Sequence, residues 1–274
     1  MNKILYALIS LAVLTGCTES YNIEGTSSIS TLDGRMLFLK VVKNKELKNI
    51  DSCDVVHGKF HFSGVIDSTR MASLYMDDES VMPVVLENGQ IVIKIDNAQQ
   101  SITGTPLNEK LYKFIDKHNQ LDNQMNELSH KQSQMIMNGG NIDNINIKLS
   151  GEADKISSQE DKLVTSFIVE NYDNVLGPGV FMMITSSYQY PILNPWIEDI
   201  MTKATEKFKN DPYVKEYYQT AQENQNRMNG LEPAGPPPSS QQQPPRSGSP
   251  ATARACRRSG RSCPRSAGSP TRRR

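Results

Sequence analysis

The sequence predicts an α+β protein in which an antiparallel β-sandwich or barrel is followed by an α-helical hairpin and further helices. As far as residue 105, β-branched and aromatic residues alternate with polar residues between closely spaced turn signals. From residue 106 onward, apolar residues instead recur every three or four positions. We therefore divide the chain into a leader (1–16), a short start of the mature chain (17–20), a β-domain (21–105), a helical region (106–229) and a disordered tail (230–274).

The first residues have the pattern of an export signal. A short positive start, Met1–Lys3, precedes the apolar run Ile4–Leu14, which is too short to span a bilayer as a helix. The four residues LTGC at 14–17 resemble the lipobox of bacterial lipoproteins, in which the cysteine thiol is acylated and the chain is cut just before it. The resemblance implies that Cys17 is the lipidation site and the first mature residue. An ordinary cleaved signal followed by a chance cysteine is the alternative.

Lipidation at this site implies a protein that is anchored in the cell envelope. A single acyl chain binds a membrane only marginally, whereas the three chains typical of such lipoproteins hold a protein there permanently. Residue 18 is threonine and not aspartate. By analogy with lipoprotein sorting, this implies the outer membrane, with the protein facing the periplasm or the cell surface.

The balance of charge is uneven along the chain. Nine of the 30 basic residues but only one of the 30 acidic residues lie in 231–274, so the body that precedes the tail is acidic. The tail contains arginine and no lysine and is rich in Pro, Ala, Ser and Gly, as expected of a shifted reading frame in G+C-rich codons or of a foreign segment. A native arginine-rich arm that binds nucleic acid or an anionic surface is the alternative. We expect no nucleic-acid partner.

Two segments predict β-hairpins. In 81–96, Asn88-Gly89 separates two β-branched runs and is the preferred two-residue hairpin turn. The pairs Leu86–Ile91, Val84–Ile93 and Met82–Ile95 then share the core face, while Glu87, Gln90, Lys94 and Asp96 take the solvent face.

The second predicted hairpin spans Asn49–Ile66, with His57-Gly58 as its turn. Its register places Cys53, Val55, Phe60 and Phe62 on one face and pairs Asp54 with His61 across the other. A turn at 32–35 and strands within 36–42, 71–76 and 101–104 bring the expected total to seven or eight strands.

Short motifs in this half support a family resemblance. YNIEG, DG before an apolar strand, IDS, GKFHFSG, LENG and ITGTPLN occur in that order. Over Tyr21–Asn108 the pattern resembles the N-terminal domain of unknown function of Bacteroidota lipoproteins, which often precedes a thioredoxin-like or peroxiredoxin-like domain. No WCxxC motif follows here. The resemblance therefore implies the β-domain without its catalytic companion.

The second half of the body predicts a helical hairpin. Thr105 is the expected N-cap, and Pro106 is the expected first helical residue. An apolar seam interrupted by His118 and Gln132 runs to a break at 138–141, and a weaker seam follows. Each arm is on the order of 40 Å long. The seam residues are Leu107, Leu111, Phe114, Leu121, Met125, Leu128 and Met135, and then Leu149, Ala153, Ile156, Leu163 and Phe167.

Further helices complete this region. Asn194-Pro195 and Asp211-Pro212 are cap-plus-proline starts of two more helices, and Gly177-Pro178-Gly179 is expected to break the chain ahead of a short buried helix, VFMMITSS. The inward residues are expected to be Trp196, Ile197, Ile200, Met201, Ala204 and Phe208 in the first, and Tyr213, Val214, Tyr217 and Tyr218 in the second.

Each candidate site residue can also be explained by a purely structural role. Cys53, His57 and His61 have the spacing of a metal site, but the predicted register points Cys53 and His61 to opposite faces, so we assign no metal site. Cys53 is interpreted as a buried structural thiol, with a reactive thiol as the alternative. His118 and His130 lie about 18 Å apart along one predicted helix and cannot share a ligand. Interhelical packing explains the tyrosines more simply than stacking on sugars.

No motif in the sequence assigns an enzymatic reaction. There is no GxSxG, HExxH or phosphate-binding glycine loop, so we assign no catalytic residue and no cofactor. The first hypothesis is a non-catalytic lipoprotein that binds another protein. The second is an accessory or degenerate thiol-disulfide or peroxide-handling protein that depends on Cys53. The third is a glycan-binding envelope protein.

Overall fold

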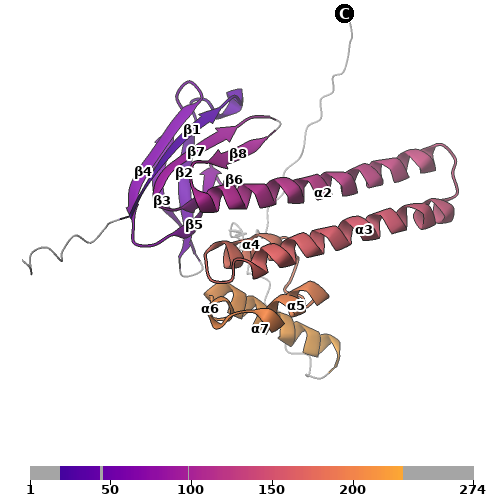
Figure 1. Ribbon diagram of the computed structural model, residues 1–274. Helices are drawn as coiled ribbons and strands as arrows, with labels where there is room; N and C mark the ends of the chain where they lie inside the picture. Colours follow the sequence, from indigo (N-terminus) through magenta and orange to yellow (C-terminus); the bar gives the residue numbers. More distant parts are fainter. Residues whose placement is uncertain (1–18, 44–45, 98, 231–274) are drawn as a thin grey trace, which may run out of the picture. The chain divides into compact units, whose positions relative to one another are not determined.

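The structure is a computed structural model that describes residues 19–43, 46–97 and 99–230 (Figure 1). Eight strands lie within these residues and form two four-stranded sheets, with the orders β4-β1-β7-β8 and β3-β2-β5-β6. All pairs are antiparallel except β1 with β7, which is parallel. The strands are β1 (Glu19–Ser27), β2 (Met36–Lys43), β3 (Glu46–Asp54), β4 (Lys59–Ile66), β5 (Arg70–Met76), β6 (Glu79–Leu86), β7 (Gly89–Ile95) and β8 (Gln100–Thr103).

Helices follow the strands, which confirms the predicted α+β class. They are α2 (Pro106–Met137), α3 (Ile142–Val169), α4 (Leu176–Thr185), α5 (Pro195–Lys203), α6 (Glu206–Lys209) and α7 (Pro212–Met228); a short 3-10 turn, η1 (Ser30–Leu32), precedes β2. The leader, the predicted lipidation site Cys17 and the tail beyond Gly230 lie outside the described residues.

The predicted hairpin at Asn88-Gly89 is wrong. β6 pairs with β5 in one sheet, whereas β7 pairs with β1 and β8 in the other, so the chain crosses between the sheets at this turn. The predicted core face is confirmed, because all six apolar residues of the proposed pairs are buried. Alternation fixes which face of a strand is apolar, but it does not fix which strand lies alongside. Two strands that bury their faces from opposite sheets give the same pattern as a hairpin.

The predicted hairpin at His57-Gly58 is wrong for the same reason. Both turn residues have positive φ, 51° and 68°, as a tight two-residue turn requires. Only Val56 and Lys59 pair across it, while β3 continues along β2 and β4 continues along β1. The predicted pair of Asp54 with His61 is therefore not formed.

The core lies between the two sheets, and the sandwich has two open sides. One lies between the edge strands β6 and β8, and α2 contacts both of them. The other lies between the edge strands β3 and β4, which contact each other. Most of β3 is exposed, and Glu46, Lys48 and Asp51 place charges along it, which discourages pairing with another chain.

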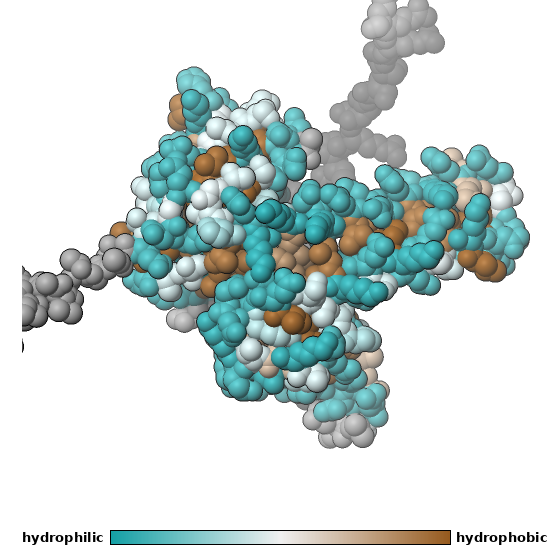
Figure 2. All heavy atoms as spheres, viewed as in Figure 1, coloured by the Kyte–Doolittle hydropathy of each residue, from teal (hydrophilic) through white to brown (hydrophobic). Residues whose placement is uncertain are grey.

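The predicted helical hairpin is formed by α2 and α3. Thr105 occupies the N-cap position of α2 with Pro106 first in the helix, and the helix ends at the predicted glycine break. The seam positions of α2 beyond Phe114 are only half-buried, and its last fully buried residue is Phe114 itself. Figure 2 shows hydrophobic residues along the hairpin where α2 and α3 meet, and again at its far end.

The remaining helices differ from the prediction in two places. Gly177-Pro178-Gly179 does not break the chain but forms the first turn of α4, where proline is tolerated because the first amides of a helix have no intrahelical partner. The helix that begins at Pro195 ends at Lys203, because Ala204 is extended and Thr205 caps a new short helix through its side chain. The predicted caps at Asn194 and Asp211 are confirmed, since both side chains accept from helical backbone amides.

Candidate functional site

The joint between the β-domain and α2 is built around one buried amide, Asn108. Its Oδ1 accepts from the backbone N–H of Val85 at 2.8 Å, and its Nδ2 donates to the carbonyl of Val85 at 2.7 Å. The side chain thus satisfies the outer edge of β6 as a neighbouring strand would. Tyr112, one turn later, donates its hydroxyl to the carbonyl of Pro83 at 3.2 Å. The start of α2 is therefore fixed to the sheet by hydrogen bonds as well as by packing.

A second polar residue at this joint, Glu87, was placed on the solvent face by the alternation pattern, and that placement is wrong. Glu87 is 8% exposed, and its Oε1 accepts from the backbone amides of Leu107 and Asn108, both at 2.9 Å. These are among the first amides of α2, which lack partners within the helix. A carboxylate at this position also interacts favourably with the helix dipole. Glu87, the residue directly after β6, thus caps the start of α2.

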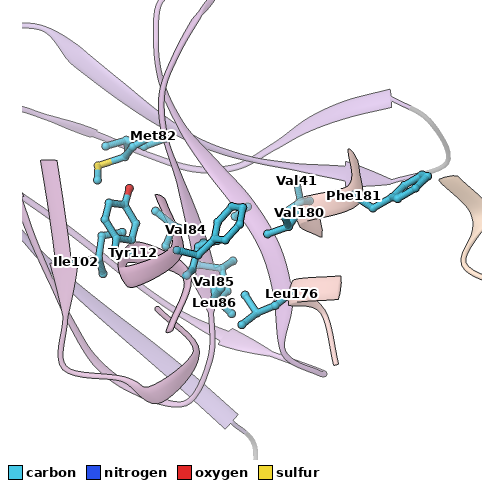
Figure 3. Close-up of a cluster of buried hydrophobic side chains, with 14 of the residues drawn as sticks. Val41, Met82, Val84, Val85, Leu86, Ile102, Tyr112, Leu176, Val180 and Phe181 are labelled. Atoms are coloured by element: carbon cyan, nitrogen blue, oxygen red, sulfur yellow. The ribbon is translucent and has the colours of Figure 1, made fainter. Parts of the chain in front are cut away.

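Apolar side chains complete the joint on both faces of β6. Figure 3 shows residues of β2, β6 and β8 in one buried cluster with residues of α2 and α4. The backbone of α4 lies close to β5 at Gly179, where an added Cβ would lie 2.6 Å from Cγ of Met71. The labelled members are Val41, Met82, Val84, Val85, Leu86, Ile102, Tyr112, Leu176, Val180 and Phe181. These side chains belong to the hydrophobic core that the strands and helices share.

Cys53 lies near the end of β3, half-buried, and packs against the core. Burial raises the pKa of its thiol, the nearby Asp51 and Asp54 raise that pKa further, and a hydrogen bond with the backbone of His61 opposes them. A raised pKa lowers the fraction of thiolate, which is the nucleophilic form. Cys53 is also the only cysteine within the described residues. This environment suits a structural thiol better than a reactive one.

The two histidines near Cys53 do not form a site with it. His57 lies in the left-handed turn between β3 and β4, and His61 lies on β4, with its Nε2 2.6 Å from Oδ1 of Asn22 on β1. Among residues 19–43, 46–97 and 99–230, no group of three or more His, Cys, Asp or Glu side chains is placed to hold a metal ion. The two other histidines are likewise apart, because His118 faces α3 and its Nε2 lies 3.1 Å from Oε1 of Glu160, while His130 is exposed.

The α2–α3 hairpin carries a group of exposed apolar side chains at the end that lies far from the sheets (Figure 1). Its tip, which we define as residues 134–147, exposes Ile136 (38%), Met137 (86%), Ile142 (54%) and Ile147 (75%). Polar pairs join the two helices next to the tip, including Gln132 with Asn146 at 2.7 Å and Lys131 with Glu152 at 3.4 Å. The hairpin is thus a paired structure with an apolar surface that no described segment of the chain covers.

The helices α4–α7 surround a cluster of aromatic rings. Phe181 lies at its centre, with ring centroids between 5.3 and 6.4 Å from those of Trp196, Phe208, Tyr213 and Tyr217. Tyr217 is buried, and its hydroxyl donates to the carbonyl of Ile192 at 3.2 Å. Interhelical packing therefore accounts for this tyrosine, and its ring face is not open to a sugar.

Two family models match the chain. The first is described as a domain of unknown function (DUF4369) and matches residues 21–111. Residues 21–111 are a DUF4369 domain. The predicted resemblance over Tyr21–Asn108 is thereby confirmed for the domain itself, and the DUF4369 domain extends into α2 far enough to include Asn108 and Leu111. The joint described above is thus part of the domain.

The second model is the prokaryotic membrane lipoprotein lipid attachment site, which matches residues 1–18. The protein is accordingly a lipid-anchored protein of the cell envelope. None of the helices in the described part of the chain combines the length and the apolar character that a membrane crossing needs. None of the curated proteins matches the sequence.

Proposed function

We propose that the protein acts without catalysis, as an outer-membrane lipoprotein that binds an amphipathic helix of another protein along its α2–α3 hairpin. The observation that carries the proposal is the exposed apolar surface of the tip. Contiguous apolar patches are rarely exposed on globular proteins, and those that are exposed often mark interaction surfaces. Lipid attachment at Cys17 would hold this surface at the membrane, facing the periplasm or the cell exterior.

A helical partner suits the geometry of the seam. The half-buried residues of α2 beyond Phe114 follow a four-three spacing, which is the pattern that accepts the side chains of a neighbouring helix. α3 packs against α2, yet the seam residues stay partly exposed. A third helix with the same spacing would complete a small bundle.

The residues beside the seam favour a partner that is recognised by its shape and by hydrogen bonds to side-chain amides, and not by its charge. Between Asn119 and Met137, the only side chains with a full formal charge are Asp122, Glu127 and Lys131, and most of the others are Asn, Gln or Ser. Such a surface gains little from a charged partner. It offers hydrogen bonds at the rim of an apolar contact.

The two other hypotheses have less support. Thiol or peroxide chemistry needs an activated cysteine, and burial raises the pKa of Cys53 instead. Glycan binding through the tyrosines of α7 needs open ring faces, and Tyr217 packs against Phe181. Membership of the Bacteroidota and a thioredoxin-like relative with the same domain stay predictions.

Photo-crosslinking in the native envelope tests the proposal. A benzoylphenylalanine replaces Ile147 at the tip, and the matched control replaces Val56, which is similarly exposed but lies in the β-domain. We expect one discrete adduct with another protein from the Ile147 position alone, and its loss on Met137→Asp. The Cys53→Ser, His57→Ala and His61→Ala variants should retain the adduct. Equal labelling from both positions, or an adduct only with a second copy of this chain, would contradict the proposal.

A further inference from the structure

We propose that the end of the DUF4369 domain that carries Glu19 rests on the surface of a zwitterionic phospholipid bilayer, with the groove between β3 and β4 facing the headgroups. The groove is lined by Tyr21, Ile50, Asp51, Ser63, Gly64, Val65, Ile66, Asp67 and Arg70. The inference rests on the lipid attachment at Cys17 that the proposed function assumes. It adds the orientation of the domain and the residues that touch the lipid.

The tether is too short to let the domain move away from the membrane. Only Thr18 separates Cys17 from Glu19, where β1 begins. Two residue steps span at most about 7 Å when fully extended. The start of β1 is held in the sheet, because Glu19 pairs with Ile66 and the amide of Ser20 donates to Oδ1 of Asn88 at 3.2 Å. The lipid therefore places this end of the sandwich within a few ångströms of the headgroups.

Two apolar side chains in the groove are exposed and do not pack into the core between the sheets. Val65 lies one residue before the end of β4 and is 67% exposed, and Ile50 on β3 is 42% exposed. Both line the same groove. In water these two side chains are a small cost, whereas at the boundary of headgroups and acyl chains they are favourable.

The charges in the groove match a zwitterion and not a simple anion. Among the residues that the structure describes, Arg70 makes only long contacts, 3.4 Å from Nε to the carbonyl of Ser68 and 3.9 Å from Nη2 to Asp67. A guanidinium has five N–H donors, so it can bind a lipid phosphate in addition. Asp51 and Asp67 line the same groove and would attract the ammonium group of the same headgroup.

The opposite end of the sandwich supplies a matched control. Val56 is 59% exposed and lies beside the turn that leads into β4. Six residue steps along β4 lead from its partner Lys59 to Val65, a distance of about 20 Å at 3.3 Å per residue. With the tether end on the membrane, Val56 lies in water.

Tryptophan quenching by brominated lipid tests the orientation. The chain has one tryptophan, Trp196, so a Trp196→Phe background gives a protein whose only reporter is the one added. The full-length lipidated chain is reconstituted in phosphatidylcholine vesicles with or without bromine on the acyl chains. We expect the Val65→Trp variant to lose roughly twofold in fluorescence with bromine, since a side chain at the headgroup boundary lies near the acyl chains. The Val56→Trp variant should not change.

A second reporter and a flotation control separate the possible failures. Ile50→Trp places the reporter on β3 in the same groove and serves if Val65→Trp does not fold; it should be quenched like Val65→Trp. Protein that floats with the vesicles but shows no quenching at either groove position would overturn the proposed orientation while the lipid anchor stands. Equal quenching of Val65→Trp and Val56→Trp would overturn it as well. Protein that does not float would overturn both this inference and the membrane tether of the proposed function.

Discussion

Replacing Asn108 by leucine should destabilise the protein far more than the same change elsewhere on α2. The side chain of Asn108 hydrogen-bonds to both the amide and the carbonyl of Val85 at the edge of β6, at 2.8 and 2.7 Å. Asn108→Leu keeps the approximate size and improves helix propensity, but it leaves both groups of Val85 buried without a partner. Each unsatisfied buried group costs about 1–3 kcal/mol, and the better helix propensity and the buried apolar surface of leucine offset part of the sum, so the expected loss is about 2–4 kcal/mol.

Urea denaturation followed by circular dichroism measures this loss. The protein used is a soluble form that starts at residue 17 and carries Cys17→Ser. With a slope of about 2 kcal/mol per molar urea, the midpoint should fall by about 1–2 M. Asn119→Leu is the matched control, because Asn119 is exposed on the same helix and its loss should change stability by less than about 0.5 kcal/mol. Equal midpoints for the two variants would refute the role assigned to Asn108.

The Asn108→Asp variant adds a pH signature to the same test. The new carboxylate would face Glu87, whose Oε1 lies 3.2 Å from Nδ2 of Asn108. Two carboxylates so close raise the pKa of one of them. Because the folded-state pKa is raised, the variant should be closest to the wild type at about pH 4 and should lose stability as the pH rises toward 7. A constant difference across this range would contradict the contact.

Three further predictions concern other parts of the chain. Iodoacetamide should modify Cys53 more slowly than free cysteine in the native protein and at an ordinary rate in urea, measured on the Cys53 peptide; equal rates would contradict the raised pKa of this thiol. Gly151→Ala should stabilise the protein by about 0.5–1 kcal/mol, because the site lies in mid-helix with open space around it. Gly177→Ala should destabilise the protein, because the added Cβ would lie 2.5 Å from the backbone oxygen of Asn171. Thermal melts in which Gly177→Ala is the more stable variant would contradict this. Burial raises the pKa of Tyr172 to about 12, so stability should fall as the pH rises from 10 to 12, and Tyr172→Phe should flatten that dependence in alkaline denaturation.

The sequence predicts where the elements of this fold lie better than how they pair. The apolar faces of β6 and β7 follow from strict alternation, and the start of α2 follows from Thr105-Pro106. The pairing of strands does not follow, because a turn between two sheets and a turn within one sheet use the same residues. The parallel pairing of β1 with β7 joins segments about 70 residues apart and leaves no local signal.

The residues at the joint show a second limit of sequence reasoning. Glu87 has the position of a solvent-facing residue by alternation, and only the arrival of α2 turns it into a buried cap. Asn108 is a polar residue next to an apolar seam position, which is ordinary on a helix. The signal that could have found it is the ITGTPLN motif, which ends at this asparagine. A motif that runs past the last strand into the first turn of a helix indicates a contact that spans both.

Mass spectrometry of the mature N-terminus tests the account most directly. Both the tethered binding function and the orientation of the DUF4369 domain require a lipid on Cys17. We expect an N-terminal peptide that begins at Cys17 and carries a diacylglyceryl group on its sulfur. A peptide that begins elsewhere, or an unmodified thiol at position 17, would contradict it.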